Sequence, residues 1–132
     1  MSQRTVLIVD DNVVNLELYA ELLGLTDYRA EMVDEAKAVL PAAIKCKPGL
    51  VLLDLTLPNS SGFEVARGLK AAPETRDIPI IALTAMQRDG LVAELQKSGF
   101  IGLVSKPCGV DTFLDAVTWA MEGCNLPFRT FA

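Results

Sequence analysis

The chain has 132 residues, 51% of them apolar, and a formal net charge of −5 that arises from 12 basic and 17 acidic side chains. This is the length of one domain with its own core; the chain is too hydrophobic to be disordered, and the lack of a basic cluster argues against direct nucleic-acid binding. Because no apolar stretch approaches the length of a membrane span, we expect a cytoplasmic protein that does not contact membranes.

The first part of the chain predicts two strands, each followed by a helix. Residues 5–9 form an apolar run typical of a buried strand, whereas residues 29–33 alternate polar and apolar side chains. Residues 12–25 predict a helix between them. Its apolar face is predicted from four residues at helical spacing, Val14, Leu18, Leu22 and Leu25. Residues 35–46 predict a second helix, which Pro41 must kink unless the proline lies near its start.

The central part of the chain continues the alternation. Residues 50–53 are wholly apolar, as expected for a strand that is covered on both faces. After a loop at residues 58–60, Ser61 and Glu64 have the spacing of a capping box, which predicts a helix that runs to about residue 71. Residues 78–83 form the next apolar strand.

The last part predicts a helix over residues 88–98 and a strand over residues 101–104. Gly99 stands in the position where helices stop. Asp111 is predicted to cap a final helix, which ends at Gly123. One face of this helix is predicted from five apolar residues, Val110, Phe113, Leu114, Val117 and Met121.

Five successive strand–helix units predict a single α/β domain, a doubly wound (βα)5 sandwich around a parallel five-stranded sheet. We assign residues 1–123 to this domain and residues 124–132 to a short C-terminal tail. The tail is expected either to be disordered or to pack through Phe128 and Phe131. The three cysteines (Cys46, Cys108 and Cys124) are odd in number and lack CxxC spacing, so neither a disulfide framework nor a zinc site is expected.

Reactive polar residues follow four of the predicted strands. They are Asp10 with Asp11, then Asp54, Thr84 and Lys106. Parallel strands place their carboxyl ends along one edge of the sheet, so these side chains are expected to meet there. Taken singly, each has an ordinary explanation as a helix cap, a turn aspartate, a strand-end threonine or a surface lysine.

Taken together, these residues predict a site for a divalent metal and a phosphoryl group. Carboxylates about 4 Å apart repel by about 4 kcal/mol at an effective dielectric near 20, which favours uptake of a cation. The chain has no histidine, so a hard, oxygen-liganded ion such as Mg²⁺ is expected. Asp11 and Asp54 are the expected direct ligands, Asp10 would act directly or through a water, and the Thr56 carbonyl is within reach. Asp54 is the candidate nucleophile, because an aspartate can hold a phosphoryl group as an acyl phosphate.

Four segments carry a resemblance to a known family. They are VLIVDDN (residues 6–12), LVLLDLTLPNSSGFE (50–64), IIALTA (80–85) and LVSKP (103–107). In this order and spacing, over residues 4–122, the chain resembles the response regulator receiver domains of two-component signalling, in particular the single-domain type. The resemblance implies a flavodoxin-like fold with strand order 2-1-3-4-5.

The resemblance also implies roles for the strand-end residues. Asp54 would accept a phosphoryl group from a phosphohistidine on a sensor histidine kinase or a histidine phosphotransfer protein. Asp10, Asp11, Asp54 and the Thr56 carbonyl would hold Mg²⁺ or Mn²⁺, Thr84 and Lys106 would contact the phosphoryl group, and the bond before Pro107 would be cis. Such a protein is a switch with weak self-catalysed phosphorylation and dephosphorylation, and it acts on an unknown downstream protein.

Two departures from the family pattern bear on that switch. Leu103 stands where many receivers carry Tyr or Phe, so a different output route is possible. Neither Thr56 nor Met86 is suited to orient a hydrolytic water, which predicts slow dephosphorylation. Two alternatives remain: a pseudo-receiver that is never phosphorylated, and an aspartyl-phosphate phosphatase, which would usually carry a second acid at the position of Thr56.

Overall fold

The computed structural model describes residues 4–57, 60–123 and 128–132. The strands are β1 (Thr5–Val9), β2 (Arg29–Val33), β3 (Leu50–Asp54), β4 (Ile80–Thr84), β5 (Gly102–Ser105) and β6 (Arg129–Phe131). The helices are α1 (Val13–Leu23), the 3-10 turn η1 (Ala36–Ala38), α2 (Val39–Cys46), α3 (Gly62–Ala71), α4 (Leu91–Lys97) and α5 (Val110–Met121). Within the described ranges, every helix is too short or too polar to cross a membrane.

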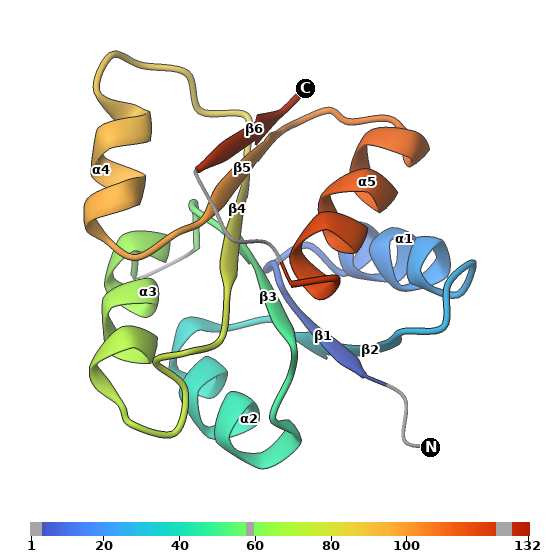
Figure 1. Cartoon of the computed structure of the whole chain (residues 1–132), viewed down its shortest axis with the longest axis horizontal. Coiled ribbons are helices and arrows are strands. Elements are labelled where there is room, and N and C mark those ends of the chain that lie inside the picture. Colours follow the sequence, from blue (N-terminus) through green and yellow to red (C-terminus); the bar gives the residue numbers. More distant parts are fainter. Residues whose placement is uncertain (1–3, 58–59, 124–127) are drawn as a thin grey trace.

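The strands form one parallel sheet in the order β2-β1-β3-β4-β5-β6. Helices α2, α3 and α4 cover one face of the sheet, and α1 and α5 cover the other (Figure 1). The predicted doubly wound α/β fold with strand order 2-1-3-4-5 is confirmed, and β6 is an additional strand at the β5 edge.

Two separate cores lie on the two faces of the sheet, because successive side chains of a strand point to opposite sides. In β1, Leu7 and Val9 belong to the core under α2, α3 and α4, whereas Val6 and Ile8 belong to the core under α1 and α5. All residues of β3 and β4 are buried. Helices cover both faces of these strands, which explains why every residue before the final Asp54 and Thr84 is apolar.

The predicted inner face of α1 is wrong for three of its four residues. Val14 is 72% exposed, Leu18 49% and Leu25 71%, whereas Leu22 is partly buried and packs against the core. The buried residues are instead Leu16, Tyr19 and Leu23. This helix is apolar on more than one side, so its spacing pattern does not single out one face. The inner face includes Tyr19, whose ring stacks on that of Phe113 in α5 at a centroid distance of 5.2 Å.

Several helix ends also differ from the prediction. Helix α5 begins at Val110, after Gly109, so Asp111 lies in its first turn rather than at the cap, and Val110 is exposed. Helix α4 begins at Leu91, because Gly90 before it adopts a left-handed backbone with φ of 82°. The predicted capping residue of α3 is confirmed, since the Ser61 hydroxyl accepts a hydrogen bond from the Glu64 amide.

Two further predictions concern the second helix and the tail. Pro41 lies in the first turn of α2, where its missing N–H breaks no helical hydrogen bond. The end of the tail is packed rather than disordered: Phe131 in β6 is buried and Phe128 is partly buried. Residues 124–127 and the predicted loop residues 58 and 59 lie outside the described residues, and the domain boundary at residue 123 stays a prediction.

Candidate functional site

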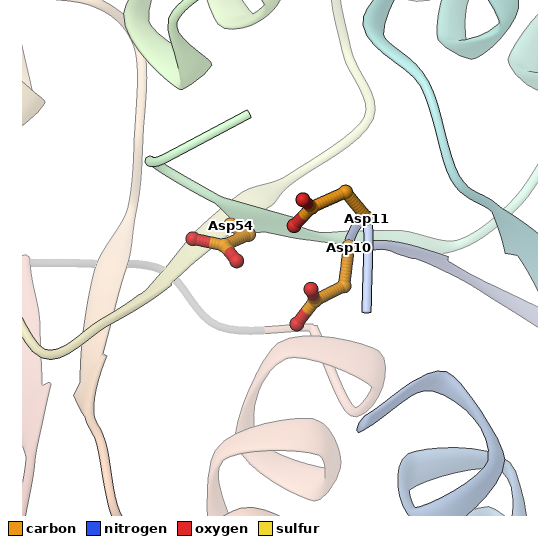
Figure 2. Close-up of side chains that lie close together, drawn as sticks. All are labelled: Asp10, Asp11 and Asp54. Carbon is orange, nitrogen blue, oxygen red and sulfur yellow. The ribbon is translucent and has the colours of Figure 1, made fainter. Parts of the chain in front are cut away.

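The four strand-end positions meet at the carboxyl edge of the sheet. Asp54 is the last residue of β3 and Thr84 the last of β4, and these strands are neighbours in the sheet. Asp10 follows β1 on the other side of β3, and Lys106 follows β5 on the other side of β4. Figure 2 shows the carboxylates of Asp10, Asp11 and Asp54 where β1 and β3 end.

The three carboxylates form a compact acidic cluster. Each of Asp10, Asp11 and Asp54 has an oxygen within 4.8 Å of an oxygen of the others. Asp10 and Asp54 are buried, at 1% and 4% exposure, whereas Asp11 is exposed. A set of hard oxygen donors that is closed on the inner side and open to solvent at Asp11 fits a divalent cation that keeps some of its water ligands.

Two asparagines hold Asp10 in place. The backbone N–H of Asn12 donates to Asp10 Oδ1 at 2.9 Å, and the side-chain Nδ2 of Asn15 donates to Asp10 Oδ2 at 3.2 Å. Asn12 is also the cap of α1, because its side chain accepts from the Asn15 amide at 3.1 Å. Sequence reasoning did not assign these roles; the signal that it could have used is a pair of asparagines at a helix start, directly after two acids.

The two oxygens of Asp54 have different surroundings. Oδ1 accepts hydrogen bonds from both the amide and the hydroxyl of Thr56, at 2.9 and 3.0 Å. Oδ2 accepts from Lys106 Nζ at 3.3 Å. Thr56 therefore fixes the rotation of the carboxylate and leaves Oδ2 on the side of the lysine.

Lys106 bridges the buried acids. Its ammonium also lies 3.2 Å from Asp10 Oδ2, and its side chain is 19% exposed. Burial acts to lower the pKa of Lys106, but electrostatic interactions with Asp54, Tyr19 and Asp10 outweigh this effect, so the pKa lies above its usual value. The lysine is therefore charged at neutral pH and offsets part of the repulsion among the carboxylates.

Thr84 and the residues of β5 complete this edge. The buried Thr84 hydroxyl accepts from the Met86 amide at 3.0 Å, and the Thr84 carbonyl accepts from the Lys106 amide at 2.8 Å. The bond between Lys106 and Pro107 is cis. Leu103 lies apart from the acids, on β5, where it borders a hollow of about 440 Å³ between β5 and the start of α4.

Gly62 brings helix α3 against the backbone that carries Asp54. A Cβ atom at this position would lie 2.8 Å from Leu55 Cα and 2.9 Å from the Asp54 carbonyl oxygen. The Gly62 amide donates to the Leu55 carbonyl at 3.1 Å. Only glycine permits this approach, a role that its place in the capping box did not indicate.

Comparisons with known proteins point to one family. A family model described as response regulator receiver domain matches residues 6–118. The polar-differentiation response regulator DivK of Brucella anthropi is 33% identical over 114 residues, which cover 86% of this chain and 93% of DivK. The same name and identity are found for the DivK proteins of Brucella ovis and Brucella suis.

Solved structures show the same fold. The chemotaxis protein CheY4 of Vibrio cholerae superposes with a TM-score of 0.85 at 23% identity, over 90% of this chain and 99% of CheY4. The receiver domain of the sensor histidine kinase PA1611 from Pseudomonas aeruginosa, solved with magnesium in its active-site cleft, gives a TM-score of 0.83 at 24% identity, over 92% of this chain and 100% of that domain.

Proposed function

This chain belongs to the response regulator receiver domains, which are switches of two-component signalling rather than true enzymes, and from this premise we propose that Asp54 is the residue that accepts the phosphoryl group. The observation that supports the proposal best is the position of Asp54 itself. It is buried at the carboxyl edge of the sheet, within the acidic cluster and beside the Lys106 ammonium. A structural ion pair alone does not account for two further acids at the same place.

The acidic cluster is proposed to hold Mg²⁺ or Mn²⁺. Asp10, Asp11 and Asp54 supply carboxylate oxygens, and the Thr56 carbonyl is proposed as a further ligand. When bound, such an ion neutralises charge on the oxygens of the phosphoryl group. The magnesium in the cleft of the PA1611 receiver domain is consistent with this assignment.

The chain's own residues position the transferred phosphoryl group and compensate its negative charge. Asp54 Oδ2 forms the new bond to phosphorus while the bond from phosphorus to the donor histidine nitrogen breaks, and that nitrogen keeps the electron pair. Oδ1 stays with its two donors from Thr56. The Lys106 ammonium and the Thr84 hydroxyl then turn to the phosphoryl oxygens, which carry the charge during transfer.

The donor is proposed to be a phosphohistidine on a sensor histidine kinase or a histidine phosphotransfer protein, in the cytoplasm. The output is proposed to be a change in a protein-binding surface that a downstream protein reads. A phosphoryl group adds close to two negative charges and several strong acceptors, enough to bias a local structure that has two arrangements.

Phosphorylation by a small donor tests this function. The protein is incubated with Mg²⁺ and a small acyl phosphate, and its intact mass is compared with that of Asp54→Asn and of a control, Asp115→Asn, an exposed acid in the middle of α5. We expect one phosphoryl group on the wild type and the control and none on Asp54→Asn. An unmodified wild type would indicate a pseudo-receiver, and steady phosphate release without an adduct would indicate a phosphatase.

A further inference from the structure

The C-terminal strand β6 pairs with β5 and forms one outer edge of the sheet, three strands away from β3, which carries Asp54. We call residues 128–132 the C-terminal strap. Within it, β6 pairs with β5 in parallel, with Arg129 opposite Gly102, Thr130 opposite Leu103 and Phe131 opposite Val104. The Arg129 amide donates to the Ile101 carbonyl at 3.2 Å. Figure 1 shows β6 as the outermost strand on this side.

Two aromatic side chains and a few polar contacts hold the strap in place. Phe128 is partly buried and packs against the core under α2, α3 and α4. Phe131 is 6% exposed, and the centroid of its ring lies 5.5 Å from that of the Trp119 ring in α5. The Thr112 hydroxyl donates to the Ala132 carbonyl at 3.3 Å. The other two side chains of β6 are exposed, so the attachment depends on Phe128, Phe131, the hydrogen bond from Thr112 and a short run of backbone pairing.

The β5 edge is shaped for this close approach. A Cβ atom on Gly102 would lie 3.0 Å from the Arg129 carbonyl oxygen and 3.3 Å from the Trp119 ring. A glycine inside a strand often marks a place where another backbone comes close. Gly102 therefore allows β6 and Trp119 to pack together on β5.

The strap is connected to the phosphorylation site through β5. This strand ends one residue before Lys106, whose ammonium pairs with Asp54. The backbone N–H of Lys106 donates a hydrogen bond to the Thr84 carbonyl. In the sheet order, β3 with Asp54 lies on one side of β5 and β6 lies on the other. A pull on Lys106 and Thr84 toward a phosphoryl group on Asp54 is therefore directed away from β6.

We propose that the C-terminal strap is a phosphorylation-controlled cover of the β5 edge. It is docked while Asp54 is a free carboxylate paired with Lys106, and it is released from β5 when Asp54 is phosphorylated. Release uncovers the β5 edge and the side of Trp119 that Phe131 covers. The inference rests on the proposed phosphorylation of Asp54, and it gives this chain a route from the site to its surface that runs through backbone pairing at Leu103 and needs no aromatic residue there.

Trp119 is the single tryptophan of the chain, and it reports directly on the strap. Quenching of its fluorescence by a neutral quencher is first calibrated with the docked wild type and with a chain that ends before Phe128. Phe131→Ala and Gly102→Ala are expected to approach the quenching constant of the shortened chain, and Phe131→Ala suffices if Gly102→Ala does not fold. Thr130→Ala, a change in an exposed side chain of the same strand, is expected to match the wild type.

The protein is then phosphorylated with Mg²⁺ and a small acyl phosphate, and mass and quenching are measured on the same sample. We expect the quenching constant of the wild type to rise to that of the shortened chain, with no change for Asp54→Asn. The shortened chain should gain the phosphoryl group without a further change in quenching.

Two results would refute the proposal that phosphorylation releases the strap, but would not contradict the proposed function. One is a phosphorylated wild type with unchanged quenching of Trp119. The other is an equal rise in the shortened chain, which would place the change in α5 rather than in the strap. A wild type that gains no phosphoryl group overturns both proposals, so the mass measurement separates the two kinds of failure.

Discussion

Replacing Asp11 with asparagine should stabilise the protein in the absence of divalent metal. Asp11 is exposed, and its carboxylate lies within 4.8 Å of those of Asp10 and Asp54. At that separation in water, each repulsion is worth about 1 kcal/mol, so the two neighbours together contribute about 2 kcal/mol. Attraction to the Lys106 ammonium offsets part of this sum, and we expect a net gain of about 1 kcal/mol in the free energy of unfolding.

The assay is urea unfolding, followed by far-ultraviolet circular dichroism, with a chelator and at low ionic strength. Asp115→Asn, an exposed acid outside the cluster, is the matched control and should change the free energy of unfolding by less than about 0.5 kcal/mol. With Mg²⁺ at about 100 times its dissociation constant, the wild type should gain about 2.7 kcal/mol and become the more stable protein.

Two observations would refute this reasoning. If Asp11→Asn were less stable than the wild type in chelator, the three carboxylates would not be acting against one another. If its advantage did not shrink with added salt, the effect would not be the screened repulsion of exposed charges.

Three further predictions concern the glycine, lysine and threonine of the site. Gly62→Ala should lower the free energy of unfolding by about 2 kcal/mol, because its Cβ would lie 2.8 Å from backbone. Gly68→Ala, in the same helix but with nothing within 4 Å, should raise it by about 0.5–1 kcal/mol, and equal effects in urea unfolding would contradict the close approach. The pKa of Lys106 is raised in the folded protein, so the charged lysine adds its full contribution to the free energy of unfolding below the unfolded-state pKa. This contribution is lost as the pH rises through the folded-state pKa. Above about pH 10, the stability of the wild type should therefore fall more steeply than that of Lys106→Met. Parallel curves over that range would count against the ion pair. Phosphorylated Asp54 should persist for minutes or longer, and Thr56→Asn should shorten this lifetime in a phosphate-release assay; a wild-type lifetime of seconds would contradict the prediction.

The strands and the residues that follow them could be predicted because their signals are local. A short, wholly apolar run such as residues 50–53, between polar and loop-forming segments, is typical of a strand that is covered on both faces. The parallel arrangement then brings Asp10, Asp54 and Thr84 to one edge. The capping role of Ser61 is equally local, since it depends on the residue three positions later.

The parts that were missed depend on contacts between distant segments. The inner face of α1 includes Tyr19, which stacks on Phe113 in another helix. The close approach at Gly62 becomes visible only when α3 lies against β3. The three residues of β6 are too few to show a period, and their partner is a strand about 27 residues earlier in the chain.

The two cores on either side of the sheet have a consequence for how the strands are aligned. A slip of one residue in β1 or β3 would exchange its two faces, yet most positions would still receive an apolar side chain. Hydrophobicity therefore distinguishes poorly between correct and shifted alignments. The acids do distinguish them, because a slip that drew Asp10 or Asp54 into a core would bury a charge away from Lys106. A chain in which these acids were replaced by leucine would keep its two hydrophobic cores, but burial of a charge would no longer penalise a shifted strand. We expect sheets with misaligned strands to be the main misfolded form of such a chain.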